Sequence, residues 1–187
     1  KLANKGDLSK FNNNWFSKGR GRIIVGLWII VNSIFFNSHF LPISSLKRVI
    51  LKWFGAKIGK GVIIKPKVCI KYPWKLEIGA NTWIGENVWI DNLDVVKIGS
   101  NCCLSQGALL LSGNHNYKKK SFDLLVRPIT LEDGAWVGAR AIVVQGVTMK
   151  SHSILAVNSV ATANLEPYGI YQGNPAVKIR ERIISES

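Results

Sequence analysis

The sequence is short of acidic residues. Asp and Glu number 11 against 25 Lys and Arg, which gives a formal net charge of +14. Long hydrophobic runs are also missing, since no apolar stretch reaches the ~18 residues of a membrane-spanning helix. We expect no secretory signal either, because the apolar stretch begins only at Ile23 and no small-residue cleavage site follows it.

Cysteine is scarce as well. Only Cys69, Cys102 and Cys103 are present, and two of them are adjacent. An odd number with this spacing predicts no disulfide framework, which favours a reducing, cytoplasmic compartment. Apolar residues, by contrast, make up 47% of the 187 residues. This content predicts one domain or two with a sizeable core and argues against wholesale disorder.

The positive charge is concentrated at one end of the chain. Residues 1–60 carry 11 of the basic residues and one acidic residue, Asp7, and they also contain the most apolar stretch, residues 23–36. One interpretation is a buried helix surrounded by solvated Lys and Arg. The other is a segment in the plane of a membrane, where anionic lipids attract each basic residue by ~1 kcal/mol. Nucleic acid is not expected, because the basic residues accompany a hydrophobic stretch rather than a stacking platform.

From Ile58 onward an aliphatic residue recurs every six positions, with two extra residues at two of the steps and one long interruption between Leu110 and Val137. The series is Ile58, Ile64, Ile70, Ile78, Ile84, Ile90, Ile98, Leu104, Leu110, Val137, Val143, Met149, Leu155 and Ala161. This period excludes a helix over residues 58–165 and predicts a parallel β-helix, an all-β solenoid with three hexads per coil. Gly or Asn would take the strained backbone at the corners.

The repeat divides the chain into three parts. Residues 1–56 form a basic, apolar segment that caps the solenoid and is a candidate for membrane contact. Residues 57–175 form the β-helix, interrupted by a loop at 112–128. Residues 176–187 are expected to form a short C-terminal helix over the other end, because four apolar residues there suggest a helical stripe. These residues are Val177, Ile179, Ile183 and Ile184.

The loop holds the most informative single residue, His115, which lies between two asparagines and is followed by Tyr117. Long loops in regular solenoids are usually functional. Histidine titrates near neutral pH and therefore suits a general base, although a lone loop histidine is also commonly an ordinary surface residue.

At this point the residues resemble the hexapeptide-repeat acyltransferases, and among them the colanic-acid-type O-acetyltransferases near the maltose and galactoside acetyltransferases. The resemblance covers roughly residues 20–182. It rests on LKWFGAKIGKGV, KYPWKLEIGANTWIGENVWIDNL, SQGALLLSGNHNY, FDLLVRPITLEDGAWVGARAIV and YQGNPAVKIR. The loop histidine and the final GNPA are its most specific parts.

The resemblance implies a left-handed coil and direct transfer of an acetyl group from acetyl-CoA to a sugar hydroxyl in exopolysaccharide or capsule synthesis. His115 would be the general base, and no metal is expected. The resemblance also implies a homotrimer with its sites at subunit interfaces. Outward Trp83, Trp89 and Val88 would otherwise expose much apolar surface. The basic end suggests work at the inner face of the membrane, on lipid-linked sugars.

Roles of further residues follow from the same resemblance. Coenzyme A would lie against Gly138, Ala139 and Val157, with Trp136 beside its pantetheine arm. Thr162 matches a position near the adenine, and Lys178 and Arg180 are candidates for the 3′-phosphate. The candidate acceptor residues are Asn87, Asp91, Trp89 and Tyr117. Ordinary structural roles stay open for several of these: rung packing for Trp136, a solvated face for Lys178 and Arg180, corner capping for Asn87 and Asp91, and packing between subunits for Trp89.

Two departures and three alternatives accompany this interpretation. Ala163 and Val177 stand where many relatives carry a cationic residue, which weakens the expected contacts to the cofactor. The alternative functions are acetylation of an antibiotic or another small molecule, and a non-catalytic scaffold. A zinc hydratase resembling the γ-type carbonic anhydrases is disfavoured, because only His115 and His152 lie in the coils.

Overall fold

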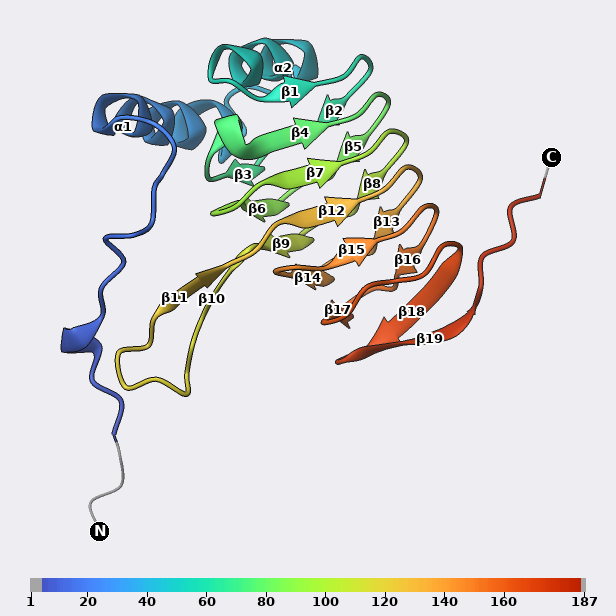
Figure 1. The fold of residues 1–187 in the computed structure, drawn as a ribbon. Helices are drawn as coiled ribbons and strands as arrows, with labels where there is room; N and C mark the ends of the chain where they lie inside the picture. Colours follow the sequence, from blue (N-terminus) through green and yellow to red (C-terminus); the bar gives the residue numbers. More distant parts are fainter. Residues whose placement is uncertain (1–4, 186–187) are drawn as a thin grey trace.

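The six-residue period of the sequence becomes a coil of three short strands. In the computed structural model, which describes residues 5–185, each coil gives one strand to each of three parallel sheets (Figure 1). The chain winds left-handed from the helices towards the C-terminus. The left-handed parallel β-helix predicted from the sequence is confirmed.

The three sheets form the faces of a prism. Sheet A consists of β1 (Lys57–Ile58), β4 (Leu76–Ile78), β7 (Val96–Ile98), β12 (Ile129–Leu131) and β15 (Thr148–Met149). Sheet B consists of β2 (Ile63–Ile64), β5 (Trp83–Ile84), β8 (Cys103–Leu104), β13 (Trp136–Val137), β16 (Ile154–Leu155), β18 (Gly169–Gly173) and β19 (Ala176–Glu181). Sheet C consists of β3 (Cys69–Ile70), β6 (Trp89–Asp91), β9 (Leu109–Leu111), β14 (Ile142–Val144) and β17 (Val160–Ala161).

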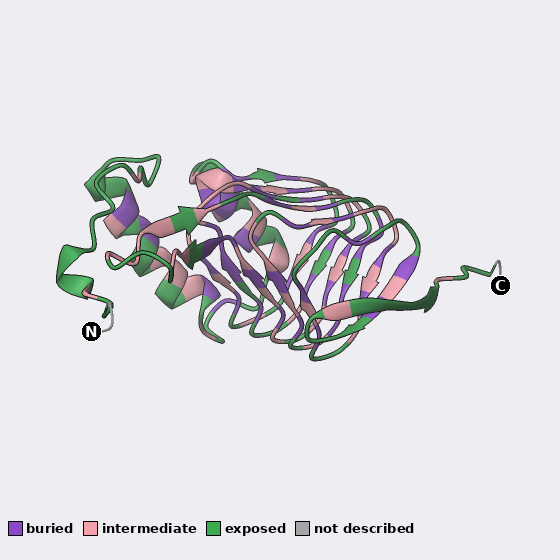
Figure 2. Ribbon diagram, turned by 60° about the horizontal axis from the view of Figure 1, so that its bottom comes forward, coloured by how far each residue is buried: buried purple, intermediate pink, exposed green. Residues whose placement is uncertain are grey.

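The aliphatic residues of the repeat fill the prism. All fourteen are buried, and they stack coil upon coil in one continuous core (Figure 2). Burying each such side chain stabilises the fold by about 1.5–3 kcal/mol. The prediction that Val88 points outward beside Trp83 and Trp89 is wrong. Val88 is fully buried, because the small residue four positions after each aliphatic residue also faces inward near a corner.

Glycine and asparagine meet two different needs at the corners. A Cβ on Gly79 would lie 2.5 Å from backbone atoms of the next coil, so only glycine allows the coils to stack there. Asn87 and Asn158 instead adopt positive φ angles of 58° and 54°, which Asn tolerates better than most residues.

Two helices cover the first coil. They are α1 (Arg22–Val31), which continues as the π-helical turn η2 (Asn32–Phe36), and α2 (Ser44–Trp53). Trp28 of α1 is buried and its Nε1 donates a hydrogen bond to the Ile70 carbonyl over 2.8 Å. Buried Lys47 of α2 donates to the Lys65 carbonyl over 2.9 Å. Within residues 5–185, no helix combines the length and the apolar content needed to cross a bilayer.

The prediction of a C-terminal helix at residues 176–187 is wrong. Residues 176–181 form strand β19, which pairs antiparallel with β18. The apolar residues Val177 and Ile179 alternate with Lys178 and Arg180, which is the period of a strand rather than of a helix. The free edge of β18 supplies backbone partners for this strand.

The loop that interrupts the solenoid contains a hairpin. Its strands are β10 (Gly113–His115) and β11 (Leu124–Val126), which pair antiparallel and project from the corner between sheets C and A (Figure 1). A short 3-10 turn, η1 (Leu8–Lys10), lies against this hairpin, and the Asp7 amide donates to the Lys120 carbonyl over 2.9 Å. A second such turn, η3 (Pro73–Lys75), fills one of the two-residue insertions.

Candidate active site

His115 ends strand β10, and its ring is held by contacts within the hairpin. Its Nδ1 lies 2.9 Å from the Phe122 carbonyl oxygen. A carbonyl can only accept a hydrogen bond, so Nδ1 carries the proton and donates it. The Nε2 atom is then left with a free lone pair, which is the state a general base requires.

Two aromatic rings also restrict the imidazole. Phe122 stacks on it with ring centroids 4.5 Å apart and an interplanar angle of 6°. Phe11, from the N-terminal segment, lies 5.6 Å away at a tilt of 57°. Residues far apart in the sequence therefore enclose one histidine, and Leu8, Phe11 and Phe122 form an apolar hollow around it.

Two of the candidate acceptor residues lie on β6, one coil above the strand that leads into the hairpin. Asp91 is buried at the end of this strand, and its carboxylate forms an ion pair with Lys71 Nζ over 2.8 Å. Its carbonyl accepts a hydrogen bond from Ser112, which precedes the hairpin. Trp89 points outward from the same strand and is 48% exposed. Asp91 and the start of the hairpin that carries His115 therefore lie at the same edge of sheet C.

A second group of candidates lies along the opposite edge of sheet C. Asn87, Ala139 and Val157 occupy the corner between sheets B and C, where the Asn158 amide donates to the Ala139 carbonyl over 3.0 Å. Gly138 lies there too, but its amide is used by the Leu155 carbonyl and a Cβ would lie 2.7 Å from backbone atoms. Its identity is explained by coil stacking rather than by a ligand.

The remaining candidates are spread over the later coils. Trp136 lies on the outer face of sheet B, and its Nε1 donates to Ser105 Oγ over 2.9 Å. Lys178 and Arg180 are exposed on β19, where Lys178 pairs with Glu181 over 2.5 Å. Thr162 is exposed just after β17. Tyr117 is exposed near the tip of the hairpin.

One chain does not bring the two groups together. Asn87 lies in the turn that precedes β6, at the corner between sheets B and C, and Asp91 is the last residue of β6, at the other edge of sheet C. His115 lies with Asp91 at one edge, and Ala139 and Val157 lie at the other.

Three contributors to this site were missed by the sequence analysis. Phe122 orients His115 through its backbone carbonyl, which no side-chain pattern announces. Phe11 reaches His115 from over a hundred residues away, and Lys71 neutralises Asp91 from the preceding coil. The spacing of 20 residues between Lys71 and Asp91, one coil of the repeat with its insertion, was the available signal for that pair.

Among residues 5–185, no three His, Cys, Asp or Glu side chains gather in a group that could hold a metal ion. The three cysteines are all free thiols. Burial raises the pKa of the Cys102 thiol to about 11, so this thiol is held in its unreactive protonated form.

No family model matches the chain. It is 34% identical over 180 residues to WcaF of Escherichia coli, named as a colanic acid biosynthesis acetyltransferase, and the match covers 96% of this chain and 99% of that protein. It is 27% identical over 150 residues to the galactoside O-acetyltransferase of Escherichia coli, covering 79% and 73% of the two chains. A hexapeptide-repeat acetyltransferase of Vibrio cholerae, solved with acetyl coenzyme A, shares the fold with a TM-score of 0.75 at 20% identity, over 87% of each chain.

Proposed function

The chain belongs to the hexapeptide-repeat acetyltransferase family, and on that basis we propose that it moves an acetyl group from acetyl-CoA to a sugar hydroxyl in exopolysaccharide or capsule synthesis. The observation that carries this proposal is the fixed tautomer of His115. Its Nδ1 donates to the Phe122 carbonyl, and its Nε2 remains free to take a proton.

The chemistry needs one base. His115 Nε2 removes the proton of the acceptor hydroxyl as the hydroxyl oxygen forms an ester bond with the acetyl carbon. The carbon–sulfur bond of the thioester breaks, and the sulfur leaves with a proton as the free thiol. The stack on Phe122 holds the imidazole in one orientation throughout, which keeps Nε2 directed at the acceptor.

The residues of this chain fit coenzyme A in part. Ala139 and Val157 offer a small, accessible corner, and Val157 is exposed. For the 3′-phosphate, Arg180 is the better of the two cationic candidates. It forms no ion pair among residues 5–185, whereas Lys178 is paired with Glu181. The thioester itself supplies the activated acetyl group.

A homotrimer would complete this site. The outer face of sheet A carries polar residues, whereas those of sheets B and C carry apolar ones with three exposed tryptophans. The outward residues of sheet A include Lys57, Glu77, Lys97, Thr130 and Thr148, and the tryptophans are Trp83, Trp89 and Trp136. Two apolar faces per prism suit a threefold arrangement in which sheet B of one copy meets sheet C of the next.

We also propose contact with the inner face of the membrane through the helical cap. Apolar residues of α1 and of the turn after it are exposed on one helical face, and α2 shows a similar stripe. The first set is Ile23, Leu27, Ile30 and Ile34, and the second is Leu46, Val49 and Trp53. A shallow groove lined by Ile24, Leu27 and Trp53 joins the two stripes. Such a surface lies in a bilayer interface rather than across it.

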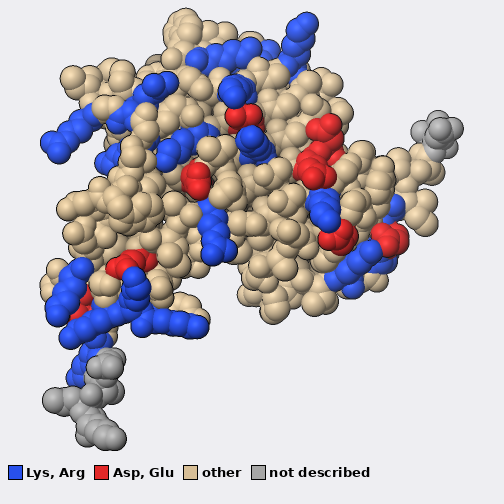
Figure 3. Space-filling model, viewed as in Figure 1, with Lys and Arg blue, Asp and Glu red and all other residues tan. Residues whose placement is uncertain are grey.

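The charges around the stripes favour an anionic lipid surface over a second protein copy. Lys and Arg side chains gather over the capping end of the solenoid (Figure 3). Lys18, Arg20, Arg22 and Lys52 are exposed, and none forms an ion pair among the described residues. Symmetric pairing of two copies would bring these like charges together at a cost, whereas each gains about 1 kcal/mol near anionic lipids.

Release of thiol from acetyl-CoA tests the proposed reaction. The acceptors are free sugars, nucleotide sugars, lipid-linked oligosaccharides and chloramphenicol, and the matched variants are His115→Ala and His39→Ala, since His39 is exposed in the cap. We expect release with one sugar class, a loss of 10²–10⁴-fold in His115→Ala, and an unchanged rate in His39→Ala. Undiminished thiol release in His115→Ala would refute the role of His115 as the general base. Binding of acetyl-CoA without thiol release in the presence of any acceptor would refute the proposal that a sugar is the acceptor.

A further inference from the structure

A cleft between α1 and the first two coils has no role in the mechanism above. It has a volume of about 260 Å³, near the lower end of the ~300–1,000 Å³ of small-molecule sites. We propose that it binds the lipid-proximal phosphate of a lipid-linked glycan acceptor together with the first part of the lipid chain. This inference rests on the proposed function, because it identifies the acceptor class of that same site.

The walls of the cleft are mostly apolar. Val25 and Ile29 of α1 line it together with Ile70 and Tyr72 of the first coil, and Trp89 of the second coil lines it as well. Ile29 lines the cleft and is nevertheless 60% exposed. An unfilled apolar wall beside a membrane-facing helix suits the first isoprenoid unit of a lipid carrier.

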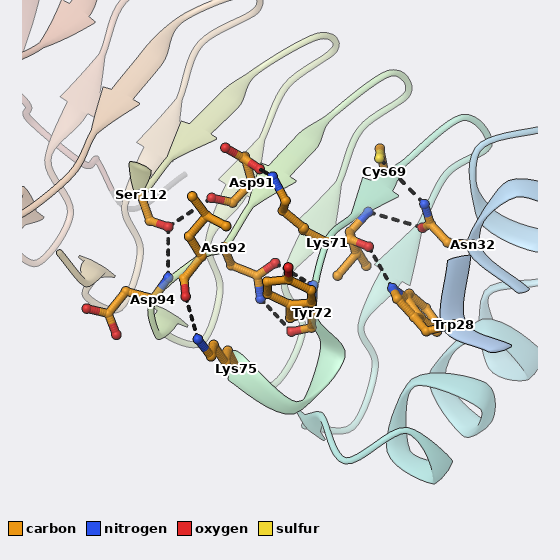
Figure 4. A network of polar contacts seen from close by, with 12 residues as sticks. Trp28, Asn32, Cys69, Lys71, Tyr72, Lys75, Asp91, Asn92, Asp94 and Ser112 are labelled. Atoms are coloured by element: carbon orange, nitrogen blue, oxygen red, sulfur yellow. Dashed lines mark hydrogen bonds and ion pairs between the residues drawn. The ribbon is translucent and has the colours of Figure 1, made fainter. Parts of the chain in front are cut away.

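Two cations accompany these walls. Lys18 and Lys71 both line the cleft, as does Asp91, whose carboxylate pairs with Lys71. Lys71 uses one of its three donors on Asp91, which leaves donors for a phosphate oxygen (Figure 4). Asn32 adds a polar group beside Cys69, to whose sulfur its Nδ2 donates over 3.5 Å. The combination of apolar walls and lysines matches a phosphate that is attached to a hydrocarbon chain.

The cleft lies between the proposed membrane surface and the catalytic histidine. The stripe containing Ile30 is on the outer face of α1, and the cleft is on its inner face, so the two are separated by one helix diameter of about 10 Å. Below the cleft, Lys71, Asp91 and Leu111 follow one another in successive coils, about 4.8 Å apart. His115 comes four residues after Leu111. A phosphate at Lys71 would therefore lie two coils above the strand that leads into the hairpin, at the edge of sheet C from which the hairpin of His115 projects.

A nucleotide sugar fits this arrangement less well. Its nucleoside would have to occupy the side of the cleft that opens beside α1, and that side would face lipid. The neutral polar side chains on that side, Asn32 and Ser33, are both engaged within the protein. Asn32 bonds the Ile70 amide and Cys69, and Ser33 Oγ donates to the Ile29 carbonyl. A hydrocarbon chain needs no such partner.

Binding of geranyl diphosphate to the full chain tests the proposal without any acetyl transfer. Calorimetry should show that it binds at least about tenfold more tightly than inorganic pyrophosphate or UDP. The matched variants are Ile29→Ser and Ile30→Ser, neighbours on α1 with exposed fractions of 60% and 57%. We expect Ile29→Ser and Lys18→Ala each to weaken binding by about fivefold or more, and Ile30→Ser to change it by less than about twofold. Equal affinity for UDP, or equal effects of the two isoleucine variants, would overturn the proposal.

Cys69 provides a second readout because it lines the cleft. In a Cys103→Ser background, buried Cys102 is held protonated, so iodoacetamide reports on Cys69. Geranyl diphosphate should slow the alkylation of Cys69 at least threefold, and an unchanged rate would contradict occupation of the cleft.

The proposed acetyl transfer and the proposed lipid-phosphate cleft can fail independently of each other. Probe binding without thiol release counts against the reaction, whereas thiol release with free sugars and no probe binding counts against the cleft.

Discussion

The state of His115 depends on one backbone atom. The Phe122 carbonyl accepts from Nδ1 over 2.9 Å, so the hairpin sets the tautomer without an acidic partner. The ring of Phe122 stacks on the same imidazole, so this one residue sets both the tautomer and the orientation of His115.

The ring of Phe122 is a positioning group that can be tested. Phe122→Leu keeps the backbone carbonyl but removes the ring stacked 4.5 Å from the imidazole. We expect kcat to fall about tenfold, because the base is then less well oriented, with the acceptor KM within about twofold. Phe16→Leu, whose ring lies over Lys75 instead, is the control and should leave both constants unchanged. A rise in KM at constant kcat would show that Phe122 contributes to binding rather than to positioning.

At the scale of the element, the solenoid was readable from the sequence because its period is set by packing. Each coil must place an aliphatic residue inside the prism, so residues such as Ile64 and Ile84 recur at fixed spacing and are buried together. The C-terminal segment was misread because Val177 and Ile179 satisfy both a strand and part of a helical stripe. Only the free edge of β18 decides between them.

The candidate site was predictable only where it lies within the repeat or its interruption. His115 was predicted because it lies in the loop that interrupts the repeat, and Asp91 because of its position in a coil. The partners of these residues come from elsewhere: a carbonyl in the hairpin, Phe11 from the N-terminal segment and Lys71 one coil earlier. Such contacts depend on the three-dimensional path of the chain, which leaves no periodic trace in the sequence.

Helix α2 carries a buried cation, and this makes the stability of the cap depend on pH. Burial lowers the pKa of Lys47 from 10.5 to about 8. Below pH 8 the Lys47 amine is protonated in both the native and the unfolded protein, so the full cost of burying its charge lowers the free energy of unfolding. Between pH 8 and 10.5 the unfolded chain binds more protons than the native one, so Lys47 makes the free energy of unfolding rise with pH, by on the order of 2 kcal/mol.

Comparison with Lys47→Met isolates this contribution. The raised pKa of Cys102, about 11, acts in the opposite direction above pH 9, because the native thiol keeps its proton longer than the unfolded one. Cys102 is common to both proteins, so it cancels in their difference. Urea unfolding across this range should show the wild type gaining stability relative to Lys47→Met as the pH rises. A constant difference would mean that Lys47 is not buried as a cation.

At the scale of the whole molecule, the cap and the solenoid carry different surfaces. The coils carry two apolar faces, on sheets B and C, and α1 and α2 carry apolar stripes with exposed cations around them. This arrangement would place three active sites one helix layer away from a lipid surface. It accounts for the concentration of positive charge at one end of the chain, which the coils themselves do not need.

Co-sedimentation with vesicles tests the membrane surface. The wild type should bind vesicles containing phosphatidylserine, more weakly at high salt, and bind phosphatidylcholine vesicles least. Leu27→Glu should reduce binding at least tenfold, and Arg22→Gln about fivefold. Leu125→Glu, an exposed leucine on β11 away from the cap, is the matched control. Equal binding by Leu27→Glu and Leu125→Glu would rule out the stripe as the contact surface.

The central claim is an acetyltransferase site shared between copies, and mixing two inactive variants tests it most directly. His115→Ala removes the base, and Val157→Trp fills the corner at the opposite edge of sheet C. If each site takes its histidine from one copy and its corner from the next, trimers reassembled from equal amounts should regain about one quarter of wild-type thiol release, since a random neighbour pair is intact in about one case in four. No recovery, from two variants that each assemble and are each inactive, would place the whole site within one chain and contradict the account.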